Sequence, residues 1–153
     1  MTELRLLAAA AAVALLAFAG PASAAGTSSS DDEESAFSAG QQAVEDEDWG
    51  AAIEHFTQAT HDDPDDADAW NMLAYSQRKS GDLTNAFANY DKALALDPEH
   101  KDAHEYMGEA YLQSGDVAGA EEHLAALEAI CPSGCEQKDE LEEAIAAWKA
   151  ANP

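Results

Sequence analysis

Two cysteines form the most distinctive local motif of the chain. Cys131 and Cys135 enclose a proline, a serine and a glycine, and the segment CPSGC has the composition of a turn. In an exported protein two cysteines usually pair, so a structural disulfide is the first interpretation. A redox couple is the alternative, but the spacing is C-x3-C rather than C-x2-C and no βαβ pattern surrounds it. A metal site or two unpaired thiols remain as further alternatives.

Two histidines have the spacing of a metal chelate. His100 and His104 lie four residues apart, which on a helix places both imidazoles on one face, where they can bind zinc or copper. The HExxH motif of zinc proteases is absent, because Lys101 follows the first histidine. His104 also has a structural interpretation, as a residue that packs between helices.

A dense group of carboxylates runs from Asp62 to Asp68 around Pro64. Such a turn attracts Ca²⁺, but it lacks the D-x-D-x-D-G order and the distal glutamate of an EF-hand loop. The structural interpretation is an acidic turn in which Asp65 and Asp66 lie near a helix N-terminus, where negative charge is favourable.

Motifs of catalysis are not found in the sequence. It has no G-x-S-x-G, no glycine loop that would hold a phosphate, and no isolated cysteine in a catalytic context. We therefore expect no catalytic residues, no cofactor and no enzymatic activity.

Composition indicates one acidic, helical domain. The chain has 153 residues, with Asp+Glu 31 against Lys+Arg 7 and a net charge of −24. This charge disfavours nucleic acid, which is bound by neutralising phosphates, and it disfavours anionic membranes for the same reason. Only 9 glycines and 5 prolines, together with many alanines, favour helices.

The N-terminal residues 1–24 are typical of a signal peptide. An apolar run from Leu6 to Phe18 is too short to span a membrane, and the small residues Ala22, Ser23 and Ala24 form a cleavage site. The expected location is the periplasm or the exterior, with no membrane association after cleavage. An uncleaved amphipathic or anchoring helix is the alternative. Residues 25–34 then predict a flexible acidic leader.

A period of 34 residues organises the remainder of the chain. Four columns keep this step through three units: one of prolines, one of aspartates, one of alanines and one of large apolar residues. The columns are Pro64, Pro98 and Pro132; Asp48, Asp82 and Asp116; Ala52, Ala86 and Ala120; and Phe56, Tyr90 and Leu124. Units of this kind bury their apolar faces only by stacking on their neighbours.

Each unit is predicted to form two helices. In the middle unit Gly81 suits the left-handed end of the first helix, and the Asp82 carboxylate is placed to cap the second. Ala86, Tyr90 and Leu94 follow at helical spacing, and Pro98 ends the helix.

These units resemble the tetratricopeptide repeat, which has this length and the pattern W-x2-L-G-x2-Y, A-x3-F, P. The middle unit supplies Trp70-x2-Leu73, Ala86-x3-Tyr90 and Pro98, and the third has His104 in the tryptophan column. The resemblance implies an all-α solenoid of three helix-turn-helix repeats, at 33–66, 67–100 and 101–134. An amphipathic stripe predicts a capping helix over 136–150.

In the family, ligands commonly lie along the first helix of each unit, on the concave side. The resemblance implies nine groove residues: Phe37, Gln41, Val44, Asn71, Tyr75, Arg78, Glu105, Glu109 and Leu112. The lysine and arginine clamp that grips a C-terminal carboxylate in chaperone-binding members is missing.

The resulting hypothesis is a non-catalytic interaction module that binds a peptide or protein of unknown identity in this groove. The alternative is a periplasmic protein that binds Ca²⁺, Zn²⁺ or Cu²⁺ through the acidic turns or through His100 and His104. The acidity itself has two further explanations, which are adaptation to high salt and electrostatic steering of a basic partner.

Overall fold

The computed structural model describes residues 35–153 of the chain. The predicted signal peptide (1–24) and acidic leader (25–34) lie outside the described residues, as does the start of the first predicted repeat.

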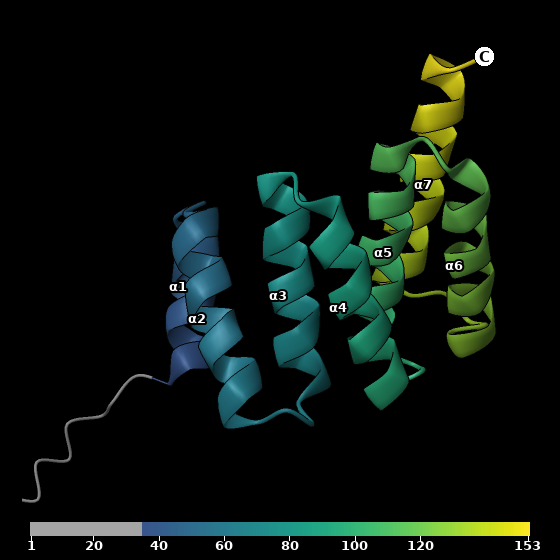
Figure 1. Cartoon of the computed structure of the whole chain (residues 1–153). Coiled ribbons are helices and arrows are strands. Elements are labelled where there is room, and N and C mark those ends of the chain that lie inside the picture. Colours follow the sequence, from purple (N-terminus) through teal and green to yellow (C-terminus); the bar gives the residue numbers. More distant parts are fainter. Residues whose placement is uncertain (1–34) are drawn as a thin grey trace, which may run out of the picture. The chain divides into compact units, whose positions relative to one another are not determined.

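The described residues form helices joined by short turns, with no strand among them (Figure 1). The helices pair in chain order, and a last helix follows the third pair. Their bounds are α1 Ala36–Glu45, α2 Trp49–Asp62, α3 Ala67–Ser80, α4 Leu83–Leu96, α5 Lys101–Ser114, α6 Val117–Ile130 and α7 Glu136–Ala151. The fold is therefore the predicted all-α solenoid, and α7 ends one residue beyond the predicted 136–150.

The aspartate column caps the second helix of every repeat. The side chains of Asp48, Asp82 and Asp116 each accept a hydrogen bond from the backbone N–H three residues later. These bonds satisfy N–H groups that a helix start leaves without a partner. The first helices of the second and third repeats are capped likewise, by Asp66 and by His100.

The turn inside each repeat requires one residue in the left-handed conformation. Gly81 and Gly115 fill this place with φ of 93° and 86°. In the first repeat the equivalent residue is Glu47, at φ 55°, which is a strained conformation for a residue with a side chain.

The core is divided into clusters that each use one helix pair and the first helix of the next unit. Phe56 of α2 packs with Leu73 of α3, and Tyr90 of α4 packs with Met107 of α5. In the last cluster Leu127 of α6 packs with Leu141 and Ile145 of α7. The helix α7 thus supplies what a fourth repeat would supply, and it covers apolar surface that would face water.

A close approach of α5 and α7 depends on a missing side chain. A Cβ atom built at Gly108 would lie 2.6 Å from a methyl carbon of Leu141, which is too short for any contact. Gly108 therefore lets the two helices pack together at this point. Within residues 35–153, no helix is both long and apolar enough to cross a lipid bilayer.

Candidate functional site

The surface where α3, α5 and α7 face one another is called the inner groove below. The helix α5 contacts both α3 and α7 directly. Of the nine predicted groove residues, Tyr75, Arg78, Glu109 and Leu112 come together here.

Two of the three predicted groove residues of the first repeat take part in core packing. Phe37 contacts Phe56 edge to face, with ring centroids 5.5 Å apart, and Val44 packs against the same cluster. Both residues therefore help to build the core of the first repeat. Gln41 is exposed on α1.

Arg78 is held at the centre of the inner groove. Its Nη2 atom lies 2.7 Å from Glu109 Oε2, and its side chain is 5% exposed. The guanidinium also lies over the rings of Tyr75 and Tyr106, 5.2 and 5.7 Å from their centroids. These contacts from two helices fix the arginine in one position, since cation–π and ionic contacts act together.

Aromatic rings continue from this centre toward the first repeat. Tyr75 lies between Tyr106, at 4.8 Å, and Trp49, at 6.1 Å between ring centroids. The ammonium of Lys79 lies over Trp49 at 5.3 Å. Three successive repeats thus contribute rings to one continuous row.

Sequence reasoning missed Trp49 and Tyr106. Both stand out when the repeats are aligned by their period: Trp49 falls in a column with Leu83 and Val117, and Tyr106 falls in a column with Ser38 and Met72. A large aromatic residue at a repeat position where the other repeats have residues of other types is the feature of the sequence that could have indicated both residues.

Three buried side-chain polar atoms of α3 and α4 have no hydrogen-bond partner. They are Asn71 Oδ1, Arg78 Nε and Tyr90 Oη. Asn71 is 2% exposed, so this predicted groove residue lies below the surface and not on it. Burial raises the pKa of Tyr90 well above its usual value, and its hydroxyl stays protonated.

Glu105 is a buried carboxyl group between α5 and α7. Its residue is 5% exposed. Desolvation raises its pKa to about 8, and the hydrogen bond to Glu140 and the nearby charges of Glu140, Glu109 and Asp102 act in the same direction. Near neutral pH the carboxyl of Glu105 therefore holds a proton.

A pocket of about 350 Å³ opens between α3, α5 and α7. Three apolar side chains and three polar ones line it. The apolar ones are Leu112, Ala144 and Trp148, and the polar ones are Arg78, Glu109 and Gln113.

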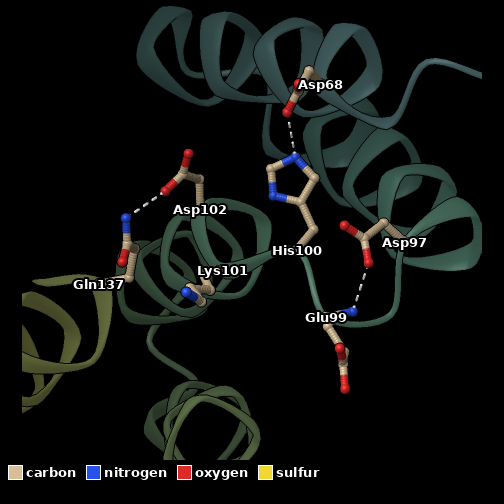
Figure 2. A pocket seen from close by; sticks show the side chains of 7 residues that line it. All are labelled: Asp68, Asp97, Glu99, His100, Lys101, Asp102 and Gln137. Atoms are coloured by element: carbon tan, nitrogen blue, oxygen red, sulfur yellow. Dashed lines mark hydrogen bonds and ion pairs between the residues drawn. The ribbon is translucent and has the colours of Figure 1, made fainter. Parts of the chain in front are cut away.

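A second, polar pocket lies at the N-terminal end of α5 (Figure 2). His100 lies on its wall, where Nε2–H donates to Asp68 Oδ1 over 2.9 Å and Nδ1 accepts from the backbone N–H of Ala103. On the opposite side Gln137 of α7 donates to Asp102. Both ring nitrogens of His100 are therefore occupied.

His104 also has both ring nitrogens occupied. Its Nε2–H donates to the carbonyl of Pro98 over 3.0 Å, and its Nδ1 lies 2.9 Å from Nδ1 of His123. Trp70 makes the equivalent bond to Pro64 in the preceding repeat, so His104 replaces the tryptophan structurally. The imidazoles of His100 and His104 are thus turned to different protein partners, and His104 has the packing interpretation that its place in the tryptophan column suggested.

The acidic run 62–68 makes local structural bonds. Asp63 accepts from the backbone of Asp65, Asp66 caps α3, and Asp68 accepts from His100. No group of three or more potential metal ligands gathers anywhere in residues 35–153.

Cys131 and Cys135 are joined by a disulfide in the turn between α6 and α7. Cys131 is the C-cap of α6 and Cys135 is the N-cap of α7. The bridge therefore connects the ends of these helices and limits how far α7 can move from the third repeat.

A family model described as the tetratricopeptide repeat matches residues 37–98 and 72–134. These ranges cover the first helices of all three units and most of the chain. The chain belongs to the tetratricopeptide repeat family. Among curated protein sequences, none matches it.

Several solved structures share the fold. The TPR2B domain of yeast Sti1, in a complex with pHsp70, has a TM-score of 0.70 and a sequence identity of 21%, and the match covers 76% of this chain and 94% of that one. The Yersinia enterocolitica chaperone SycD, in complex with a peptide of the translocator YopD, has a TM-score of 0.68 and a sequence identity of 20%. The match covers 82% of this chain and 98% of that one. The Sgt2 TPR domain from Aspergillus fumigatus has a TM-score of 0.68 and a sequence identity of 25%. The match covers 80% of this chain and 82% of that one.

Proposed function

We propose that this chain is a non-catalytic interaction module that binds a peptide or a protein segment in the inner groove. The observation that carries the proposal is the arrangement around Arg78, where rings, an ion pair and a pocket from three helices meet at one surface. Rigid aromatic and arginine side chains of this kind are the usual anchors of protein interfaces.

The structural relatives support the same function. Sti1 TPR2B is described in a complex with pHsp70, and SycD in a complex with a peptide of the translocator YopD. Their likeness concerns the fold, and the groove of this chain has its own chemistry, because Asn71 and Glu105 are buried and Arg78 is paired with Glu109. Transfer of the general function is therefore reasonable, and transfer of their particular ligands is not.

We further propose that the protein acts outside the cytoplasm. The signal-peptide features of residues 1–24 support this, and the disulfide is suited to an oxidising compartment. Mass spectrometry of the protein isolated from expressing cells is expected to find a mature chain that begins at Ala25. A full-length chain that stays in the cytoplasm would contradict export.

The test of the interaction is affinity capture with residues 25–153 as bait in a periplasmic extract, followed by mass spectrometry. Two lysines that each lie over a tryptophan provide a matched pair of variants. Lys79 lies over Trp49 beside the inner groove. Lys92 of α4 lies over Trp70 of α3, with its ammonium nitrogen 4.0 Å from the ring centroid.

A groove partner is expected to be lost with Lys79→Ala combined with Tyr75→Ala, which removes one cation and one ring of the aromatic row, and to be retained with Lys92→Ala. Recovery of the same proteins by all three baits, in saturable amounts, would show that binding uses another surface. Failure to recover any saturable partner at low and high salt would argue against the interaction module itself.

A further inference from the structure

The pocket between α3, α5 and α7 combines an apolar wall with an acidic edge. Leu112, Ala144 and Trp148 provide the apolar wall, and the volume of about 350 Å³ is of the order of one or two amino-acid side chains. Because Ala144 and Trp148 belong to α7, this pocket depends on the capping helix and is not made by the repeats alone.

Carboxylates follow the pocket along both of its long helices. Glu109 lines the pocket on α5, and Glu140 precedes Ala144 by one helical turn on α7. Asp102 lies about two turns before Glu109 on α5, where it accepts from Gln137. The acidic edge is defined here as these three carboxyl groups: Asp102, Glu109 and Glu140. Glu105, which is buried and protonated, is not part of it.

This acidic edge is poorly neutralised by the protein itself. Arg78 forms an ion pair with Glu109, whose side chain remains 34% exposed. No lysine or arginine of residues 35–153 forms an ion pair with Asp102 or Glu140. A cationic ligand would therefore find acceptors here, whereas an anionic ligand would meet repulsion from the edge and from a net charge of −24.

We propose that this pocket binds a partner segment in which one large apolar side chain is flanked by lysine or arginine. The apolar side chain lies between Leu112, Ala144 and Trp148, and the flanking cations lie along the acidic edge. This inference rests on the proposed function and specifies the chemistry of the partner. It separates the chain from members of its family that hold an acidic C-terminus in a basic clamp.

The probes are three short peptides with acetylated and amidated ends. The first carries a leucine between lysines, the second carries the same leucine between glutamates, and the third carries serine between lysines. Binding is measured by fluorescence anisotropy of a labelled peptide against residues 25–153 at low salt. The expected order is the first peptide strongest, the third weaker, and the second without measurable binding.

Gln113 allows a test that leaves the fold intact, because this residue is exposed on the pocket rim. Gln113→Arg is expected to weaken binding of the leucine–lysine peptide about threefold to tenfold, and Gln113→Glu to strengthen it, as one partly screened charge would do. Trp148→Ala is expected to remove the preference for leucine over serine, with circular dichroism as the check that α7 remains folded.

Equal or stronger binding of the glutamate peptide would overturn the proposal. So would identical affinities for Gln113→Arg and Gln113→Glu, or no binding of any peptide. None of these results bears on whether the extract contains a groove-dependent partner, so failure of the specified chemistry is distinguishable from failure of the interaction module.

Discussion

His123, which is partly buried, and Glu105, which is buried, are two groups whose shifted pKa values make stability depend on pH. His123 lies between His104 and the ring of Tyr111, and desolvation together with the nearby His104 lowers its pKa to about 4. Glu105 faces Glu140 across α5 and α7, and its pKa is raised to about 8. Both groups are therefore uncharged in the folded protein near neutral pH.

The first prediction concerns acid. Between pH about 6.5 and about 4 the unfolded chain binds a proton at residue 123 that the folded chain does not, so the free energy of unfolding falls as the pH falls through this range. Asparagine is the residue at the equivalent position of the second repeat, Asn89. The variant His123→Asn is therefore expected to lose about 2 kcal/mol less of its free energy of unfolding than the wild type over this pH range. Urea denaturation at pH about 6.5 and at pH about 4 measures the free energy of unfolding of both proteins. His61→Asn, at an exposed histidine, is the control.

The second prediction concerns the loss of stability as the pH rises through neutrality. Between pH about 4.5 and about 8 the folded chain holds a proton at Glu105 that the unfolded chain releases, so stability falls as the pH rises. Glu105→Gln keeps a hydrogen-bond donor toward Glu140 and cannot ionise. It is expected to be more stable than the wild type at alkaline pH by on the order of 2 kcal/mol, and similar to it near pH 5. An equal gain from Glu143→Gln on exposed α7 surface would contradict this explanation.

At the scale of helices and turns, stability depends on a few backbone positions that the repeat places in register. The left-handed position is glycine in two repeats and Glu47 in the first. The close approach of α5 and α7 requires that Gly108 has no side chain. Glu47 is strained, so a glycine at that position is expected to raise stability. At Gly108 any side chain is expected to lower stability.

Glu47→Gly is expected to stabilise the protein by about 1 kcal/mol. The left-handed conformation costs a residue with a Cβ atom about 1–2 kcal/mol, and part of this gain is offset by the greater freedom of glycine in the unfolded chain. Thermal unfolding measures the change. The matched replacement Glu54→Gly, on the exposed face inside α2, is expected to destabilise, because glycine is unfavourable within a helix.

Gly108→Ala is expected to destabilise by about 1–3 kcal/mol, because the new methyl group overlaps Leu141 and forces α7 away from α5. Gly50→Ala is the control, since its Cβ atom would meet only a carboxylate oxygen at 3.5 Å and alanine favours helix. Hydrogen exchange in α7 is expected to increase in the first variant alone. Unchanged exchange there would show that the helix is not held by this contact.

At the scale of the whole molecule, charge is the dominant feature. A net charge of −24 on 153 residues destabilises any compact state by self-repulsion, and salt screens this repulsion. The unfolding temperature is therefore expected to rise with sodium chloride concentration at fixed pH. A rise that continues into molar salt favours adaptation to a saline environment, whereas a flat response would remove that explanation and leave steering of a basic partner.

Much of the architecture follows from the sequence because it depends on local or periodic features. The 34-residue columns predict the helix pairs, the aspartate column predicts the caps, and Gly81 predicts a left-handed turn. Each of these effects involves residues within one turn or one repeat. The stripe at 136–150 likewise predicts α7, since amphipathic periodicity marks a helix with one buried face.

The inner groove could be predicted only in part, because its residues meet across helices. The family resemblance implied that Tyr75, Arg78 and Glu109 share one groove, but it did not include Trp49 and Tyr106 beside them. It also could not distinguish an exposed groove position from a buried one, and Asn71 proved to be buried.

What the sequence determined by itself is the repeat, its helices, their caps and the acidic character of the molecule. Tertiary structure alone decided that His104 meets His123, that Glu105 meets Glu140, and that Trp148 closes a pocket. These partners come from different helices, and which side chains meet depends on the distance and angle at which the helices pack. Those quantities arise from the fit of many side chains at once, so no single motif in the sequence encodes them.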